Sequence, residues 1–249
     1  MFLISEHFFI ESSCGKIGAW FLRPDKREES NEVIILYLHG VKGTRARAHR
    51  LELYKVLLAQ GYRILSIDYR GFGDSSDTSE TEDSVVEDAR TSLAWLRQSG
   101  RLGEADRLIV WGHSMGTGVA TRALAEDTGR VDGLILEAPY NNFTDEIIHF
   151  TTTTSSSFAN ATLSSLYSCA GQTLPNALLT FFNMEFNSDS WIKQISCPIM
   201  ILHAKGDTVI PISLGWKLYE AAVEGGNKYV EFQEFDENYD HRKSSHDIL

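Results

Sequence analysis

The sequence predicts an α/β protein built on a mostly parallel sheet that is flanked by helices. A chain of 249 residues is long enough to form one large α/β domain with a sizeable core. Short continuous apolar runs, typical of strands buried on both faces, alternate with segments of about ten to fifteen residues in which apolar side chains have helical spacing. This alternation indicates a parallel sheet with helices on both faces, and we expect a single domain over residues 1–249.

The chain opens with an antiparallel hairpin, because His7–Ile10 and Lys16–Leu22 are strand-like and flank a short Ser/Gly turn. The elements that follow are predicted from continuous apolar runs for strands and from helical spacing for helices. They alternate along the chain, with strands at 33–38, 63–69, 108–111, 132–139, 198–203 and 228–235, and helices at 48–60, 84–98, 117–126 and 214–223. Gly61 follows the first helix and is expected to end it.

A G-x-S-x-G motif at residues 112–116 lies between a predicted strand and a predicted helix. This is the context of a nucleophile elbow, in which a serine sits in a sharp, strained turn and the flanking glycines avoid collisions. Ser114 is therefore the candidate nucleophile, and the N–H of Met115, at the start of a helix, is a candidate donor to a developing oxyanion. The alternative interpretation is an ordinary Gly-Ser turn.

An H-G-x-x-G motif at residues 39–43 follows the predicted strand at 33–38. Glycines at this place let the backbone approach a substrate, and the N–H of Val41 would then point at the ester oxygen. We expect Val41 and Met115 to form the oxyanion hole. The alternative interpretation is a glycine turn after a strand.

The candidate acid and base come later in the chain. Asp207 follows the predicted strand at 198–203, and a histidine in the C-terminal tail would be the base. Both His241 and His246 are available, and His241 is favoured because it lies closer to the last predicted strand. The resulting order of serine, aspartate and histidine is that of the α/β-hydrolases.

Other histidines and aspartates near strand ends are expected to have structural roles. His113 would point away from the nucleophile in an elbow, and His39 and His203 are expected to pack or to form hydrogen bonds. Asp68 and Asp74 precede the serine, whereas the acid follows it in this order, so both are expected to fix loops.

Residues 141–190 interrupt the alternation of strands and helices and are too long for a plain connection. The segment is rich in Ser, Thr, Phe and Leu, and its clustered phenylalanines favour a cap or lid with an apolar inner wall over a solvated loop. We expect any contact with a membrane surface to be made through this cap.

Composition excludes several classes of function. The net charge is −11, and no block of Lys or Arg forms a phosphate-binding stripe, so nucleic acid is not an expected partner. The three cysteines show no C-x-x-C spacing, which argues against a disulfide scaffold and a zinc site, and we expect neither a metal nor a cofactor. The sequence contains no apolar run of about 18 residues and no clear signal peptide. It does not predict the oligomeric state.

Five segments carry a resemblance to a known family: LYLHGVKGTRARAHRLELYKVL, DYRGFGDS, VWGHSMGTGVAT, LILEAPYNN and CPIMILHAKGDTVIPISLGWKLY. Together they resemble the lysophosphatidylserine and monoacylglycerol lipase branch of the α/β-hydrolases, the α/β-hydrolase domain-containing protein 12 family. The resemblance runs from about residue 16 to residue 241 and is weakest in the cap. It implies the α/β-hydrolase fold, with Ser114 as nucleophile, Asp207 as acid and His241 as base. Residues 238–241 (NYDH) then correspond to the family's Gly-Tyr-Arg-His.

The resemblance also implies an integral protein of the endoplasmic reticulum whose N-terminal helix anchors a lumenal catalytic domain. Such a protein would cleave the single acyl ester of a lysophospholipid or monoacylglycerol. The chain departs from the family by having no membrane anchor and by stopping at Leu249, where the family continues into a helix that packs on the last strand. We therefore expect a truncated C-terminal helix, as in a soluble form or an incomplete gene product.

The sequence thus predicts a serine esterase that acts on single-chain lipid esters. Two alternatives stay open. One is a hydrolase of small esters or peptide bonds with the same fold, and the other is a catalytically silent form that binds a lipid or a partner because its C-terminus is short.

Overall fold

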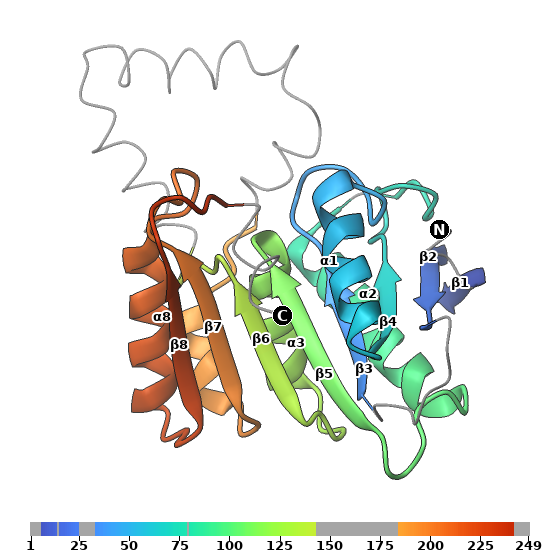
Figure 1. Ribbon diagram of the computed structural model, residues 1–249. Helices are drawn as coiled ribbons and strands as arrows, with labels where there is room; N and C mark the ends of the chain where they lie inside the picture. The colour runs from blue at the N-terminus through green and yellow to red at the C-terminus, as the bar shows by residue number, and fades with distance from the viewer. Residues whose placement is uncertain (1–5, 14, 25–32, 79, 143–183, 242–249) are drawn as a thin grey trace.

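The chain forms an eight-stranded sheet with helices on both sides, shown as a computed structural model in Figure 1. The structure describes residues 6–13, 15–24, 33–78, 80–142 and 184–241. The strands are β1 (Glu6–Ser12), β2 (Gly15–Leu22), β3 (Val33–Leu38), β4 (Arg63–Ile67), β5 (Arg107–His113), β6 (Gly133–Glu137), β7 (Ile199–Ala204) and β8 (Val230–Phe235). The helices are α1 (Ala48–Ala59), α2 (Glu82–Gln98), α3 (Met115–Glu126), α7 (Ser188–Trp191), the 3₁₀ turn η1 (Ile192–Gln194) and α8 (Ile212–Glu224).

The strand order across the sheet is β1-β2-β4-β3-β5-β6-β7-β8. β1 pairs with β2, and β2 with β4, in antiparallel fashion, and every other neighbouring pair is parallel. The mostly parallel sheet and the N-terminal hairpin predicted from the sequence are therefore confirmed. The expected cap at 141–190 lies largely outside the described residues.

Side chains that alternate along β3 serve the two faces of the sheet. Ile34, Leu36 and Leu38 belong to the large core that also holds the apolar sides of α2, α3 and α8. Ile35 and Tyr37 belong to a second cluster, formed against α1. Because both faces of β3 are buried, its sequence is a continuous apolar run and does not alternate between apolar and polar residues.

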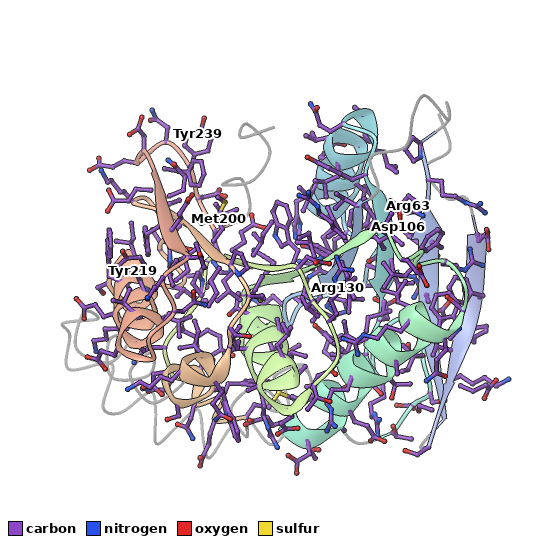
Figure 2. The ribbon with its side chains drawn as sticks, turned by 90° about the horizontal axis from the view of Figure 1, so that it is seen from below. Arg63, Asp106, Arg130, Met200, Tyr219 and Tyr239 are labelled. Atoms are coloured by element: carbon purple, nitrogen blue, oxygen red, sulfur yellow. The ribbon has the colours of Figure 1, made fainter. Side chains whose placement is uncertain are left out.

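An ion pair links two segments at the amino ends of the parallel strands. Arg63, the first residue of β4, lies beside Asp106, which immediately precedes β5, as Figure 2 shows from below. Nη2 of Arg63 is 2.6 Å from Oδ1 of Asp106. The carboxyl ends of the same strands meet at the opposite edge, which is where loops in parallel sheets carry functional groups.

Three helix starts lie two residues before the sequence expectation, and one of them is that of α8, which begins at Ile212 where residue 214 was predicted. α2 begins at Glu82, because Thr81 and Ser84 form a reciprocal capping box that satisfies backbone N–H groups at the start of the helix. α3 begins at Met115, directly after the serine of the elbow and two residues before the predicted start. Across the part of the chain that the structure describes, no helix combines the length and apolar character needed to cross a bilayer.

Candidate active site

Ser114 occupies a strained turn between the last residue of β5 and the first residue of α3. Its φ angle is 54° and its ψ angle is −122°, a backbone conformation that a residue with a side chain rarely adopts. The backbone N–H of Ser114 donates to the carbonyl of Glu137 at 3.0 Å, which ties the turn to the end of β6. The turn therefore presents the serine side chain at the carboxyl end of the sheet.

The two glycines of the elbow motif allow the chain to make this turn. A Cβ atom at Gly112 would lie 2.3 Å from the carbonyl oxygen of Gly116, and a Cβ atom at Gly116 would lie 2.0 Å from the carbonyl oxygen of Leu38. Real Cβ atoms do not approach backbone this closely, so both positions require glycine. α3 can thus begin against the end of β3, with the serine at its N-terminus.

The structure brings Ser114, His241 and Asp207 into one hydrogen-bonded chain. Nε2 of His241 is 3.1 Å from Oγ of Ser114, and Nδ1 of His241 is 2.8 Å from Oδ2 of Asp207. This is the arrangement in which an imidazole can take the proton of a serine hydroxyl while a carboxylate fixes its tautomer and orientation. His246, the other candidate base, lies outside the described residues.

Asp207 is held in its ionised form. Burial by itself raises the pKa of this carboxyl, but its contacts outweigh burial and lower the pKa well below its usual range. His203 and His241 face the carboxylate, with Nε2 of His203 at 3.6 Å, and the N–H groups of Val209 and Ile210 donate to Oδ1 at 2.8 and 2.9 Å. Hydrogen bonds to the carboxylate favour its charged form and thus keep the acid negative.

Two contacts place the loop that carries His241. His113, the last residue of β5, donates from Nε2 to the carbonyl of His241 at 2.8 Å. Gly206 lies against the same loop, because a Cβ atom there would be 2.3 Å from the carbonyl oxygen of Glu237 and 2.6 Å from that of Tyr239. The imidazole of His113 therefore holds the loop that carries His241 through its backbone.

The segments that carry the two predicted oxyanion donors both adjoin Ser114. The loop that holds Val41 passes against Ser114, since a Cβ atom at Gly40 would be 3.0 Å from Cβ of Ser114. Met115 is fully buried and starts α3. Within the described residues, neither the N–H of Val41 nor that of Met115 has a hydrogen-bond partner. These unpaired donors can stabilise negative charge that develops beside Ser114.

The earlier aspartates bind an arginine and are not part of the triad. Asp68 accepts from the backbone N–H and from Nη1 of Arg45, both at 2.6 Å. Asp74 accepts from Nη1 and Nη2 of the same guanidinium at 2.7 and 2.9 Å. They fix the loops after β3 and β4, which is the structural role expected from the sequence.

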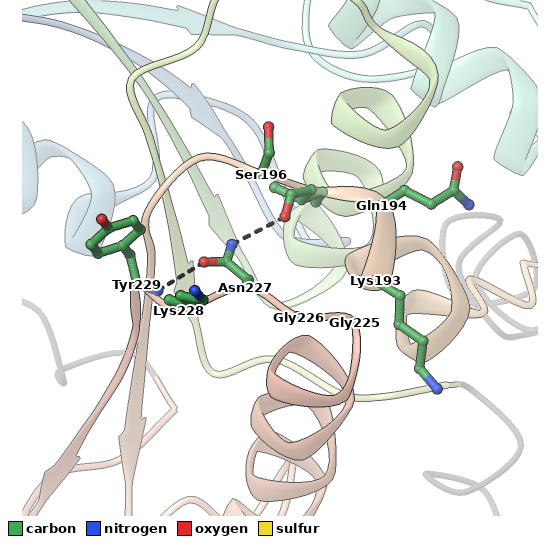
Figure 3. Close-up of a pocket in the computed structure, with 9 residues that line it drawn as sticks. Lys193, Gln194, Ser196, Gly225, Gly226, Asn227, Lys228 and Tyr229 are labelled. Carbon is green, nitrogen blue, oxygen red and sulfur yellow. Dashed lines mark hydrogen bonds between the residues drawn. The ribbon is translucent and has the colours of Figure 1, made fainter.

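A hollow between two loops lies away from this site. It has a volume of about 280 Å³ and is lined by residues 193–196 and 225–229, which precede β7 and β8 (Figure 3). Asn227 spans it: Nδ2 donates to the carbonyls of Ile195 and Cys197, and Oδ1 accepts from the N–H of Tyr229. These hydrogen bonds hold the loops before β7 and β8 together at the amino ends of the strands. In the described ranges, no three His, Cys, Asp or Glu side chains are grouped so as to hold a metal ion.

Comparison with known proteins identifies the family. The model of the family described as Hydrolase_4, serine aminopeptidase S33, matches residues 29–180, which is more than half of the chain. The chain belongs to this family. The matched stretch includes Val41 and Ser114 and ends before Asp207 and His241.

The chain is also similar to curated proteins, several of which are named lysophosphatidylserine lipases. It is 38% identical over 218 residues to lysophosphatidylserine lipase ABHD12 of Danio rerio, covering 84% of this chain and 51% of that protein. It is 35% identical over 221 residues to protein ABHD12B of Homo sapiens, covering 85% of this chain and 55% of that protein. The chain thus spans about half the length of the curated relatives it matches, and the resemblance inferred from its motifs is confirmed.

Solved structures share the fold of this chain at low sequence identity. Esterase Pf2001 of Pyrococcus furiosus aligns with a TM-score of 0.70 at 23% identity, covering 97% of this chain and 85% of that one. Est1E of Butyrivibrio proteoclasticus aligns with a TM-score of 0.69 at 15% identity, covering 96% and 92%. The fold is that of the α/β-hydrolases, as predicted.

Two residues that shape the candidate site were not predicted from the sequence. Gly206, whose missing side chain leaves room for the loop of His241, had no expected role, and His203 was not expected beside Asp207. A glycine directly before the candidate acid was a usable signal for the first. The second had none, because the contact depends on how the loop after β7 folds back.

Proposed function

We propose that the chain is a serine hydrolase that cleaves the single acyl ester of lysophospholipids or monoacylglycerols through an acyl-enzyme on Ser114. The observation that carries the proposal is the hydrogen-bonded chain from Asp207 through His241 to Ser114. The substrate class is supported by the relatives at 35–40% identity, several of which are named lysophosphatidylserine lipases.

The reaction follows from these positions. Oγ of Ser114 attacks the acyl carbonyl while His241 takes the proton of the Ser114 hydroxyl. The N–H groups of Val41 and Met115 stabilise the resulting oxyanion. The imidazolium then gives its proton to the leaving alcohol as the ester bond breaks. Water, deprotonated by His241, attacks the acyl-enzyme and releases the fatty acid and the free serine. Ionised Asp207 stabilises the imidazolium in both halves, and the reaction needs no cofactor.

A second candidate is hydrolysis of small esters or peptide bonds by the same residues. The name of the family, serine aminopeptidase, favours it, because an amide carbonyl can use the same nucleophile and oxyanion hole. A catalytically silent chain is less supported, since the three side chains lie at hydrogen-bonding distances.

A fluorophosphonate probe and a substrate panel test the proposal. The probe should label the native protein but not the Ser114→Ala variant. The Ser92→Ala variant is the control and should be labelled, because Ser92 is also a buried serine but lies on α2. Asp207→Asn should lower kcat by about 10³ to 10⁴-fold, because the imidazole takes the wrong tautomer. Lysophospholipids and monoacylglycerols should be turned over faster than short-chain esters and aminoacyl amides.

Two outcomes would contradict the proposal. Folded native protein that neither labels nor hydrolyses any ester would exclude the chemistry. Faster cleavage of aminoacyl amides than of lipid esters would keep the chemistry and replace the substrate class.

The place of action belongs to the same proposal. Likeness to the α/β-hydrolase domain-containing protein 12 family supports the endoplasmic reticulum, and the phenylalanines of residues 141–190 support contact with a membrane surface through the cap. Fractionation of cells that express the chain, with and without residues 143–183, tests both statements.

A further inference from the structure

Arg50 is a buried cation next to the candidate active site. It lies in the first turn of α1, its exposed fraction is 2%, and it is among the largest fully buried side chains. Within the described residues, no carboxylate lies at ion-pair distance from its guanidinium. Burying a charge without a counter-ion costs free energy unless polar groups surround it. The polar groups that Arg50 contacts therefore indicate what the buried guanidinium does.

Among the described residues, the hydrogen bonds of Arg50 go to the loop that carries the predicted oxyanion donor. Nη2 donates to the carbonyls of Gly40 and Lys42 at 3.1 and 2.9 Å, and Nη1 donates to the carbonyl of Thr44. The three carbonyls alternate along the loop between β3 and α1. Because the guanidinium is a rigid, planar fork, three bonds from it fix the shape of the loop.

The bond to Gly40 acts directly on the N–H of Val41. The carbonyl of Gly40 and the N–H of Val41 belong to one peptide group, which is planar and trans, so fixing the direction of one fixes the opposite direction of the other. His39 donates from Nδ1 to the same carbonyl at 2.8 Å. Two hydrogen bonds to this oxygen polarise the peptide group and strengthen its N–H as a donor.

We propose that Arg50 is a positioning residue for the oxyanion hole: it holds and polarises the Gly40–Val41 peptide group so that the Val41 N–H meets the oxyanion formed on attack by Ser114. The inference rests on the proposed function, because this N–H matters only if Ser114 forms a tetrahedral intermediate. Removing a single oxyanion donor lowers kcat by about 10² to 10³-fold in a serine protease, and Arg50 acts through such a donor. We therefore expect a loss of about 10 to 100-fold.

Two variants of Arg50 and a matched control test the role. Arg50→Met removes the fork, and Arg50→Lys keeps the charge but cannot reach all three carbonyls. Arg63→Met removes another largely buried arginine and its ion pair, at the edge of the sheet away from the site (Figure 2). For each folded protein, fluorophosphonate titration to completion counts the competent molecules, and kcat and KM are measured for one lipid ester. A trifluoromethyl ketone with the same acyl chain reports binding of the tetrahedral oxyanion.

The expected result separates positioning from stability. Per competent molecule, kcat falls by about 10 to 100-fold in Arg50→Met and by less in Arg50→Lys, while KM changes by less than about threefold. The inhibition constant of the trifluoromethyl ketone rises in proportion to the loss in kcat/KM. Arg63→Met is less stable but keeps its kcat per competent molecule.

Other results would overturn the inference. Normal kcat per competent molecule in both Arg50 variants, with lowered stability alone, would give Arg50 a purely structural role. If Arg50→Met does not fold, Arg50→Lys decides, because an unchanged inhibition constant there excludes the role. Native protein that neither labels nor turns over an ester would instead reject the proposed function, a result that the variants do not mimic.

Discussion

A histidine that takes no part in proton transfer supports the candidate base. His113 is buried, with an exposed fraction of 4%, and its Nε2–H donates to the backbone carbonyl of His241. Burial lowers the pKa of His113 to about 4, although the charge of Glu137 opposes this, and the neighbouring His241 lowers it further. The imidazole is thus neutral near pH 7, and it can donate from one nitrogen without placing a second cation beside the base.

The low pKa of His113 makes stability depend on pH. Between pH 6.5, its ordinary pKa, and pH 4, its value in the fold, the unfolded chain binds a proton that the folded chain does not. Stability therefore falls as pH falls through this window, and this residue accounts for about 2 kcal/mol of the loss between pH 7 and pH 5. Urea unfolding of the native protein and of His113→Gln at both pH values measures it. The variant should lose about 2 kcal/mol less on acidification, and an equal loss in both proteins would contradict the assignment.

Single residues were predictable where a motif fixes their chemistry. Ser114 follows from its flanking glycines, and Asp207 and His241 follow from their places after late strands and from the resemblance. The contacts among them were not predictable, since they join positions 34 and 127 residues apart. Arg50 was missed because its partners are backbone carbonyls, which leave no pattern in the sequence.

At the level of elements, the site depends on how closely β3, β5 and α3 approach one another. The N-terminus of α3 packs against the carboxyl end of β3. The contact is so close that Gly116 has no room for a Cβ atom beside the Leu38 carbonyl. The close approach keeps Met115 and the loop of Val41 next to Ser114. Packing between these elements, and not helix propensity alone, therefore sets where α3 begins.

Gly116→Ala tests this close approach. The new Cβ would lie 2.0 Å from the Leu38 carbonyl oxygen, so α3 must shift, and we expect a loss of about 3 kcal/mol in the free energy of unfolding together with a lower kcat. Gly103→Ala is the matched control, because a Cβ there comes no closer than 3.4 Å to a flexible Asp106 side chain. Urea unfolding and ester hydrolysis measure both effects. Equal stability of the two variants would mean that α3 tolerates displacement.

Most elements were predictable because burial dictates their sequence. Strands buried on both faces read as continuous apolar runs, and the longer helices carry an apolar stripe. The start of α3 was placed two residues late, because a Gly-rich stretch after the serine is a poor helix former. The short α7 and η1 lie at or just beyond the end of residues 141–190, the expected cap, and were not predicted as helices. A helix of one turn has too few residues to show a helical period.

The charge of the whole molecule bears on which substrates reach the site. The chain carries a net charge of −11, and the relatives named lysophosphatidylserine lipase are named for an anionic lipid. Repulsion acts over a Debye length, which is about 30 Å in 10 mM salt and about 8 Å in 150 mM salt. At low salt an anionic substrate therefore feels the total charge, and at high salt it feels only groups near the entrance to the site.

Salt should therefore affect anionic and neutral esters differently. For a body of about 20 Å radius, screening of this net charge lowers the repulsion enough to raise kcat/KM of a singly charged ester by about threefold from 10 to 150 mM salt. Short-chain lysophospholipids below their micellar concentration provide the anionic substrate, and a monoacylglycerol of equal chain length provides the neutral control, whose kcat/KM should not change. Initial rates at several salt concentrations measure both. A decrease with salt for the anionic ester alone would mean that cations beside the oxyanion loop, such as exposed Lys42, dominate the local field over the net charge.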